Sequence, residues 1–139
     1  MSLPSVARVP RAIQIGVVED DVSVGRALAR LLRGHGYECV VFRSGETALA
    51  ALELHGLHCL IVDIQLGGMD GFEFCGKLDA AGMCIPHIFI TAYFDPERSD
   101  RPDSLGDGIL LLKPIDEHEL LASIERAMDI SRKGRNSPP

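Results

Sequence analysis

The sequence lacks a hydrophobic run long enough to cross a membrane. No apolar stretch approaches the roughly 20 residues that a membrane-spanning helix requires. Residues 1–11 include Pro4 and Pro10 and have no apolar centre, so they do not resemble a signal peptide. We therefore expect a cytoplasmic protein with no membrane partner, in which residues 1–11 form a disordered leader.

The sequence also lacks closely spaced cysteines. Its four cysteines form no Cys-x-x-Cys pair, and no histidine is placed to complete a zinc site with them; they are Cys39, Cys59, Cys75 and Cys84. This pattern favours ordinary reduced core thiols over a metal or redox site.

Basic residues are fewer than acidic ones. The 14 Lys and Arg residues are outnumbered by 20 Asp and Glu residues, which gives a formal net charge of −6. The only basic cluster along the sequence is the tail Arg132, Lys133 and Arg135. Because a nucleic-acid backbone is bound by clustered Lys and Arg, we expect no direct nucleic-acid binding by these residues.

What the sequence does contain is an alternation of short apolar runs with helix-length amphipathic segments. Its 139 residues suffice for one domain with a real core, which we place at residues 12–130. The polar residues 131–139 are expected to be a disordered tail or the stub of a linker. The alternation itself is typical of an α/β protein in which repeated βαβ units form a parallel sheet.

The elements can be placed from the hydrophobic pattern. Strands are predicted over residues 13–18, 38–42, 59–62, 85–91 and 109–112. Helices are predicted over residues 23–33, 45–55, 72–81 and from Ile115 or Asp116 to about Ile130, with Ser44 as the N-cap of the second. The fourth of five helical slots, residues 95–104, contains two prolines, so we expect it to be short or irregular.

Chemically distinctive residues stand where the predicted strands end. These are Glu19-Asp20-Asp21, Asp63, Thr91 and Lys113. In an open parallel sheet, ligands bind beyond the carboxyl ends of the strands, so these side chains should converge. Carboxylates this close stay ionised only beside a cation, and all-oxygen ligation suits Mg²⁺.

The predicted site has the components of phosphoryl transfer. Asp63, on the central strand, is the natural nucleophile for forming an aspartyl phosphate. Lys113 and Thr91 could each take one phosphoryl oxygen as negative charge spreads over that group. Each residue also has a purely structural interpretation, because Asp21, Ser23 or Asp70 could be a cap or turn former. Their joint occurrence on successive strand ends favours the site.

Five segments resemble the receiver domain of bacterial response regulators, the CheY-like fold, between about Ile13 and Met128. They are Val17-Val-Glu-Asp-Asp21, Leu60-Ile-Val-Asp63, Gly68-Met-Asp-Gly71, Phe89-Ile-Thr-Ala92 and Leu112-Lys-Pro114. The resemblance implies a single doubly wound five-stranded parallel sheet of strand order 2-1-3-4-5, with helices on both faces. In style the sequence is most similar to receivers of regulators with a helix-turn-helix output domain.

The resemblance implies a role for each residue. Asp63 would be the phosphoacceptor, Asp20 the principal Mg²⁺ ligand, Glu19 a ligand through water, and Gln65 a ligand through its backbone carbonyl. Thr91 would hydrogen-bond the phosphoryl group, and Lys113 would pair with it, before a cis bond to Pro114. The implied partners are a sensor histidine kinase or phosphotransfer protein and an output domain or partner protein, and a homodimer is possible. Such a domain takes part in its own phosphorylation and dephosphorylation without being a conventional enzyme.

The sequence departs from the family pattern at two positions. Gly67 stands where the loop after the phosphoacceptor usually has a proline, and Leu110 stands where the last strand usually has a Tyr or Phe. These departures, with the Pro-rich fourth slot, put the usual switch surface in doubt. By the same resemblance, Gln65 and Tyr93 occupy positions that influence hydrolysis of the phosphoryl group.

Two other classes of protein share parts of this pattern. A haloacid-dehalogenase-like phosphatase places its nucleophile in an Asp-x-Asp-x-Thr motif, which the segment from Glu19 to Ser23 does not fit. The second alternative is a receiver-like interaction module that works without phosphorylation. Leu110 and the irregular fourth slot favour it, but the intact acidic residues argue against it.

Overall fold

The computed structural model describes residues 12–93 and 109–136. The expected leader over residues 1–11 and the whole Pro-rich fourth slot, residues 95–104, lie outside these ranges, so both expectations remain predictions. Within the described ranges, no helix is both long and apolar enough to cross a membrane.

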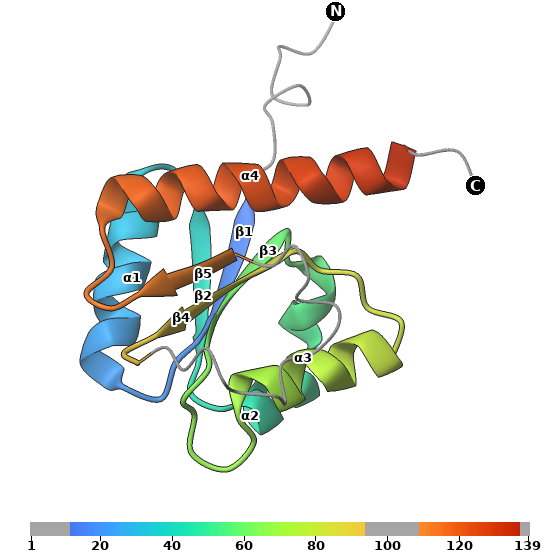
Figure 1. The fold of residues 1–139 in the computed structure, drawn as a ribbon, viewed down its shortest axis with the longest axis horizontal. Helices are drawn as coiled ribbons and strands as arrows, with labels where there is room; N and C mark the ends of the chain where they lie inside the picture. Colours follow the sequence, from blue (N-terminus) through green and yellow to red (C-terminus); the bar gives the residue numbers. More distant parts are fainter. Residues whose placement is uncertain (1–11, 94–108, 137–139) are drawn as a thin grey trace, which may run out of the picture.

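A five-stranded parallel sheet forms the centre of the molecule (Figure 1). The strands are β1 (Gln14–Val18), β2 (Glu38–Phe42), β3 (Cys59–Asp63), β4 (His87–Thr91) and β5 (Ile109–Leu112). Their order in the sheet is β2-β1-β3-β4-β5, and every neighbouring pair is parallel. The predicted strand positions and the implied strand order are confirmed.

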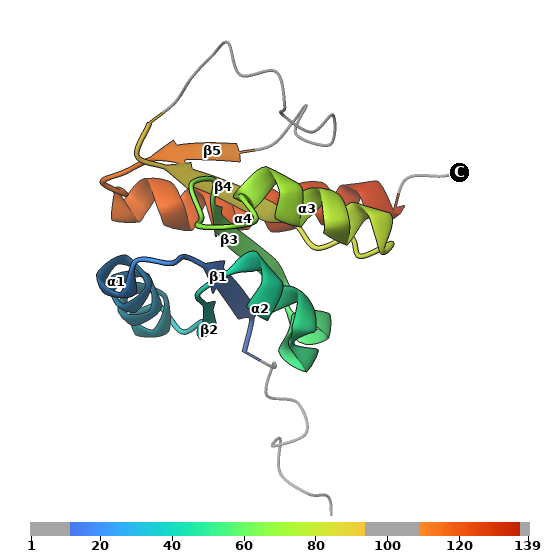
Figure 2. The ribbon, with the colours of Figure 1, turned by 90° about the horizontal axis from the view of Figure 1, so that it is seen from below.

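Helices cover both faces of this sheet (Figures 1 and 2). They are α1 (Val22–Gly34), α2 (Gly45–Ala50), the 3-10 helix η2 (Leu52–Gly56), α3 (Gly71–Ala80) and α4 (Glu117–Asn136). Side chains of a strand alternate between faces, so β3 sends Cys59 and Ile61 to one core cluster and Leu60 and Val62 to the other. The first cluster is closed by α1 and α4, and the second by α2, η2 and α3.

The helix predicted over residues 45–55 is broken, which corrects that prediction. It begins as expected, with the Ser44 hydroxyl accepting a hydrogen bond from the Thr47 N–H at 3.0 Å. Ala51, however, is extended (φ −86°, ψ 132°), and a 3-10 helix follows it. At 3.6 residues per turn, a continuous helix would place Leu52 on the same face as the buried Ala48. The break instead buries Leu54 and exposes Leu52, so core packing overrides local helix propensity.

The last helix is longer than predicted. Its start agrees, because the Asp116 carboxylate accepts a hydrogen bond from the Glu119 N–H at 2.9 Å, as an N-cap does. Its end at Asn136, rather than near Ile130, makes residues 131–136 helical instead of disordered. Arg and Lys are good helix formers, so a polar composition alone did not exclude a helix there.

The four cysteines differ sharply in their surroundings. Cys59 and Cys75 are buried core residues as expected, whereas Cys39 is half-buried and Cys84 is exposed. Burial raises the pKa of Cys59 and Cys75 to about 12 and that of Cys39 to about 11. The prediction of core thiols therefore holds for two cysteines and is wrong for Cys84.

These surroundings predict selective thiol labelling. N-ethylmaleimide at neutral pH should modify Cys84 first and leave Cys59 and Cys75 unmodified until the protein unfolds. The thiolate is the reactive species, and a rise in pKa from 9.0 to about 12 reduces it on the order of 1,000-fold, besides the steric protection. Peptide mass spectrometry with and without urea measures the order. Equal labelling of Cys59 and Cys84 in the native protein would contradict the structure.

Candidate functional site

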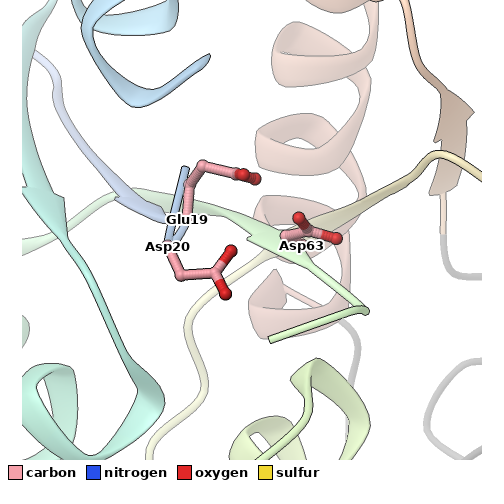
Figure 3. Close-up of side chains that lie close together, drawn as sticks. All are labelled: Glu19, Asp20 and Asp63. Carbon is pink, nitrogen blue, oxygen red and sulfur yellow. The ribbon is translucent and has the colours of Figure 1, made fainter. Parts of the chain in front are cut away.

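Three carboxylates meet at the carboxyl edge of the sheet. Glu19 and Asp20 follow β1, and Asp63 ends the neighbouring strand β3, whose register pairs Val18 with Val62. One carboxylate oxygen of each lies within 4.8 Å of the others. Figure 3 shows the three side chains, which extend from the ends of these two strands into one space. The predicted convergence of these acids is thus present in the structure.

The three carboxylates differ in burial, and the pKa of Glu19 is raised. Glu19 and Asp63 are buried, with 1% and 2% of their surfaces exposed, whereas Asp20 is exposed. Burial and, after it, Asp63 raise the pKa of Glu19, Lys113 lowers it, and together they bring it to about 7. The three carboxylates therefore carry more negative charge than the single ammonium group of Lys113 neutralises.

Lys113 reaches both buried acids. Its Nζ donates a hydrogen bond to Asp63 Oδ2 at 2.8 Å and to both Glu19 carboxylate oxygens at 3.2 Å. Burial lowers the pKa of Lys113, but its bonds with Asp63 and Glu19 outweigh that effect and raise it. Lys113 therefore lies at the predicted site, its pairing with a phosphoryl group stays a prediction, and the cis bond before Pro114 is confirmed. The contact between Lys113 and Glu19 was not predicted from the sequence.

Thr91 ends β4 beside the acids and is buried, but its hydroxyl is engaged elsewhere. It donates a hydrogen bond to the Tyr93 carbonyl at 2.8 Å and accepts one from the Tyr93 N–H at 3.3 Å. The structure thus places Thr91 at the predicted strand end, with its oxygen turned to the following loop. Tyr93 itself is exposed.

Backbone N–H groups of the loop after β3 hold two of the carboxylates. The Gln65 N–H donates to Asp63 Oδ1 at 2.9 Å, and the Gly67 N–H donates to Asp20 Oδ2 at 3.2 Å. Proline has no N–H, so the usual family residue at position 67 could not make the second bond. The departure at Gly67 therefore fixes the Asp20 side chain, a function that sequence reasoning missed.

Two further acids at the same edge are helix caps. Asp21 accepts a hydrogen bond from the Val24 N–H at 3.1 Å and is the N-cap of α1. Asp70 accepts one from the Glu73 N–H at 2.8 Å and is the N-cap of α3. Their structural interpretation is confirmed, which narrows the site to Glu19, Asp20 and Asp63.

Glu46 ties the glycine-rich loop to α2. Its Oε1 accepts a hydrogen bond from the Met69 N–H at 3.1 Å, next to Gly68, whose positive φ of 76° suits glycine. Hydrogen bonds from its own backbone N–H and, after it, from the Met69 N–H lower the pKa of Glu46. The bond therefore forms above the ordinary Glu pKa and weakens as the pH falls through the lowered value.

Removing this tether should loosen the loop. In Glu46→Ala, we expect amide hydrogen exchange at Met69 to accelerate several-fold, up to about tenfold, because one intramolecular hydrogen bond is lost. Glu46→Gln keeps an acceptor oxygen and should exchange more slowly than Glu46→Ala. Glu53→Ala removes an exposed glutamate from η2 and serves as the control. Unchanged exchange at Met69 in Glu46→Ala would show that the bond does not hold the loop.

The donor set fits Mg²⁺. Three carboxylates face one ammonium group, all candidate ligands are oxygens, and Asp20 is open to solvent. Mg²⁺ prefers oxygen ligands and commonly retains waters while one or two carboxylates bind it. The raised pKa of Glu19 agrees with a site in which one ammonium group faces three carboxylates.

Comparisons of the sequence with known proteins relate the chain to one family. A family model described as the response regulator receiver domain matches residues 15–125. Nodulation protein W of Bradyrhizobium diazoefficiens is 35% identical over 121 residues, covering 87% of this chain and 53% of that protein. Transcriptional regulatory protein ZraR of Escherichia coli K12 is 33% identical over 116 residues, covering 84% of this chain and 26% of that protein. The chain therefore spans about half or less of these relatives.

Solved structures also resemble this chain. The response regulator StyR is 34% identical with a TM-score of 0.77, covering 90% of this chain and 63% of that one. The chemotaxis protein CheY4 of Vibrio cholerae is 24% identical with a TM-score of 0.75, covering 84% of this chain and 99% of that one. The second likeness concerns the fold alone.

Proposed function

The chain belongs to the response regulator receiver domain family of two-component signal transduction, and we propose that Asp63 is its phosphoacceptor in a Mg²⁺-dependent reaction. The observation that carries the proposal is the position of the Asp63 carboxylate. It ends the central strand, touches Lys113 at 2.8 Å and lies beside Glu19 and Asp20. A buried carboxylate held this way is pre-positioned as a nucleophile.

The reaction forms one bond and breaks one. An Asp63 carboxylate oxygen attacks the phosphorus of the donor, the bond to the donor's leaving group breaks, and an aspartyl phosphate results. When bound by Glu19, Asp20, Asp63 and the Gln65 carbonyl, Mg²⁺ would supply positive charge for the carboxylates and phosphoryl oxygens. Lys113, already at the site, offers its ammonium to an oxygen of the transferred group.

Thr91 has a separate role in the proposal. Its hydroxyl would leave the Tyr93 carbonyl and donate a hydrogen bond to a phosphoryl oxygen. This exchange would couple the state of Asp63 to the loop that follows β4, because Tyr93 would lose its partner. Such a coupling provides a route from phosphorylation to a change in surface shape.

Partners and location follow from the same proposal. The donor would be a sensor histidine kinase or phosphotransfer protein in the cytoplasm. The phosphorylated domain would change its interaction with an output domain or a partner protein that controls transcription, as the regulatory relatives suggest. Gln65 is exposed near Asp63, where it would influence water attack and hence the lifetime of the aspartyl phosphate.

Incubation with acetyl phosphate tests the proposal. The intact mass should rise by one phosphoryl group in the presence of Mg²⁺ and stay unchanged with EDTA. The adduct should be labile, as acyl phosphates are. Failure to gain mass, together with failure to bind beryllofluoride, would overturn the proposal and favour the interaction module that works without phosphorylation.

A further inference from the structure

Four arginines line one hollow on the surface of the domain. Arg26, Arg30 and Arg33 recur on one side of α1 at helical spacing, and Arg43 directly follows β2. Together they line a hollow of about 480 Å³ between α1 and β2, which we call the arginine groove. Figure 2 shows α1 lying alongside β1 and β2 at this end of the sheet.

The concentration of charge in the groove is unusual for this chain. The structure describes seven Lys and Arg side chains, and four of them line the groove; the other three are Lys77, Lys113 and Arg126. The chain as a whole carries a net charge of −6. The arginine groove is therefore a local positive surface on an acidic molecule.

Three of the four arginines bind no other group within the described part of the domain. Arg33 donates a hydrogen bond to the Cys39 carbonyl at 2.9 Å and thereby holds the edge of β2. Among the described residues, Arg26, Arg30 and Arg43 make no hydrogen bond or ion pair, and all three are exposed. Their guanidinium groups are free to bind carboxylates through paired N–H donors.

The groove has a defined place relative to the site described above. Glu19 is its only acidic lining residue, and that carboxylate is already bound by Lys113. An occupant of the groove would therefore lie next to the carboxyl edge of the sheet. Val22 and Val41 add apolar surface to the same lining.

We propose that the arginine groove binds an acidic segment of a partner protein. The hollow is wide and its arginines are exposed, unlike the enclosed and mostly apolar pockets that small ligands prefer. The chain is acidic overall, with a net charge of −6, so it would repel the long, evenly charged backbone of a nucleic acid over a greater length than a short acidic segment. Arginine is enriched among the residues that dominate protein interfaces, and paired Asp or Glu side chains match its geometry. The proposal does not depend on phosphorylation of Asp63.

Binding of a fluorescent octaglutamate peptide to the unphosphorylated protein tests the proposal. We expect saturable binding at low ionic strength that weakens as salt is added. The triple variant Arg26→Ala, Arg30→Ala, Arg43→Ala should bind at least about tenfold more weakly, because three exposed charge pairs are lost. Arg33 is kept in this variant since it supports β2. The control Lys77→Ala, Arg126→Ala removes exposed cations elsewhere and should change the affinity less than about twofold.

A second measurement keeps the test valid if the triple variant folds poorly. Amide chemical shifts of the wild-type protein should move on α1 and around Arg43 when the peptide is added, and should stay still along α4. Peptide binding that the control variant weakens as much as the triple variant would overturn the proposal. So would shifts centred on another surface, or tighter binding of oligothymidylate of equal charge.

Discussion

The Asp63→Asn variant is expected to gain no phosphoryl group from acetyl phosphate under conditions that label the wild-type protein completely. An amide oxygen is a poor nucleophile and cannot form the acyl phosphate, while the variant preserves the shape of the side chain. Intact mass spectrometry in Mg²⁺ measures the result. A persistent adduct in Asp63→Asn would show that another residue, with Asp20 the nearest candidate, accepts the group.

Lys113→Ala provides a graded comparison for the same assay. This variant retains the nucleophile and removes the ammonium that lies 2.8 Å from it. Loss of one preorganised charge at a reacting group typically costs about 100-fold or more in rate. We therefore expect slow labelling of Lys113→Ala, in contrast with none of Asp63→Asn. Equal loss in both variants would assign Lys113 an indispensable role beyond charge stabilisation.

The same substitution of Asp63 should stabilise the metal-free fold. Glu19 and Asp63 are both buried and share one ammonium, so removing one negative charge relieves repulsion. The pKa of Glu19 is raised from 4.5 to about 7, so its contribution to stability is complete below 4.5 and declines as the pH rises through 7. In EDTA, Asp63→Asn should unfold at a higher temperature than the wild type at pH 8. This difference should shrink when Mg²⁺ supplies the missing charge.

The sequence predicted the site because a parallel sheet turns chain order into proximity. Each β-strand ends at the same edge, so acids after β1 and β3 and a lysine after β5 had to lie near one another. The alternation of apolar residues in β3 likewise fixed which side chains enter each core cluster. Both results follow from the two-residue period of side chains in a strand and from the parallel arrangement of the strands. Both features can be inferred from one sequence.

Features that depend on side-chain reach were not predictable in this way. The double contact of Lys113 with Glu19 and Asp63 depends on the path of a long side chain across β4. The bond from Gly67 to Asp20 depends on the local shape of a loop. The arginine groove brings Arg43 close to the arginines of α1. The positions of the charged residues along the sequence do not predict this grouping. The break at Ala51 was decided by the core, against local propensity.

The glycine at the start of α3 should be essential for both stability and the placement of Asp63. A Cβ atom at Gly71 would lie 2.5 Å from the Asp63 carbonyl oxygen and 2.9 Å from the Ile64 Cα, both backbone atoms. The Gly71 N–H also donates to the Ile64 carbonyl at 3.0 Å, so the helix start cannot retreat without breaking that bond. Gly71→Ala should therefore lower the free energy of unfolding by at least about 2 kcal/mol, as overpacking does.

Gly76 in the same helix offers a matched control. Its Cβ position meets no atom within 4 Å, so Gly76→Ala should raise the free energy of unfolding by up to about 1 kcal/mol through better helix propensity. Urea denaturation measures both changes, and equal effects of the two substitutions would contradict the close contact at Gly71. Because the clash falls on the backbone of Asp63, Gly71→Ala should also slow phosphoryl uptake in the fraction that remains folded. Gly76→Ala should leave that rate unchanged, since its added methyl group faces open space.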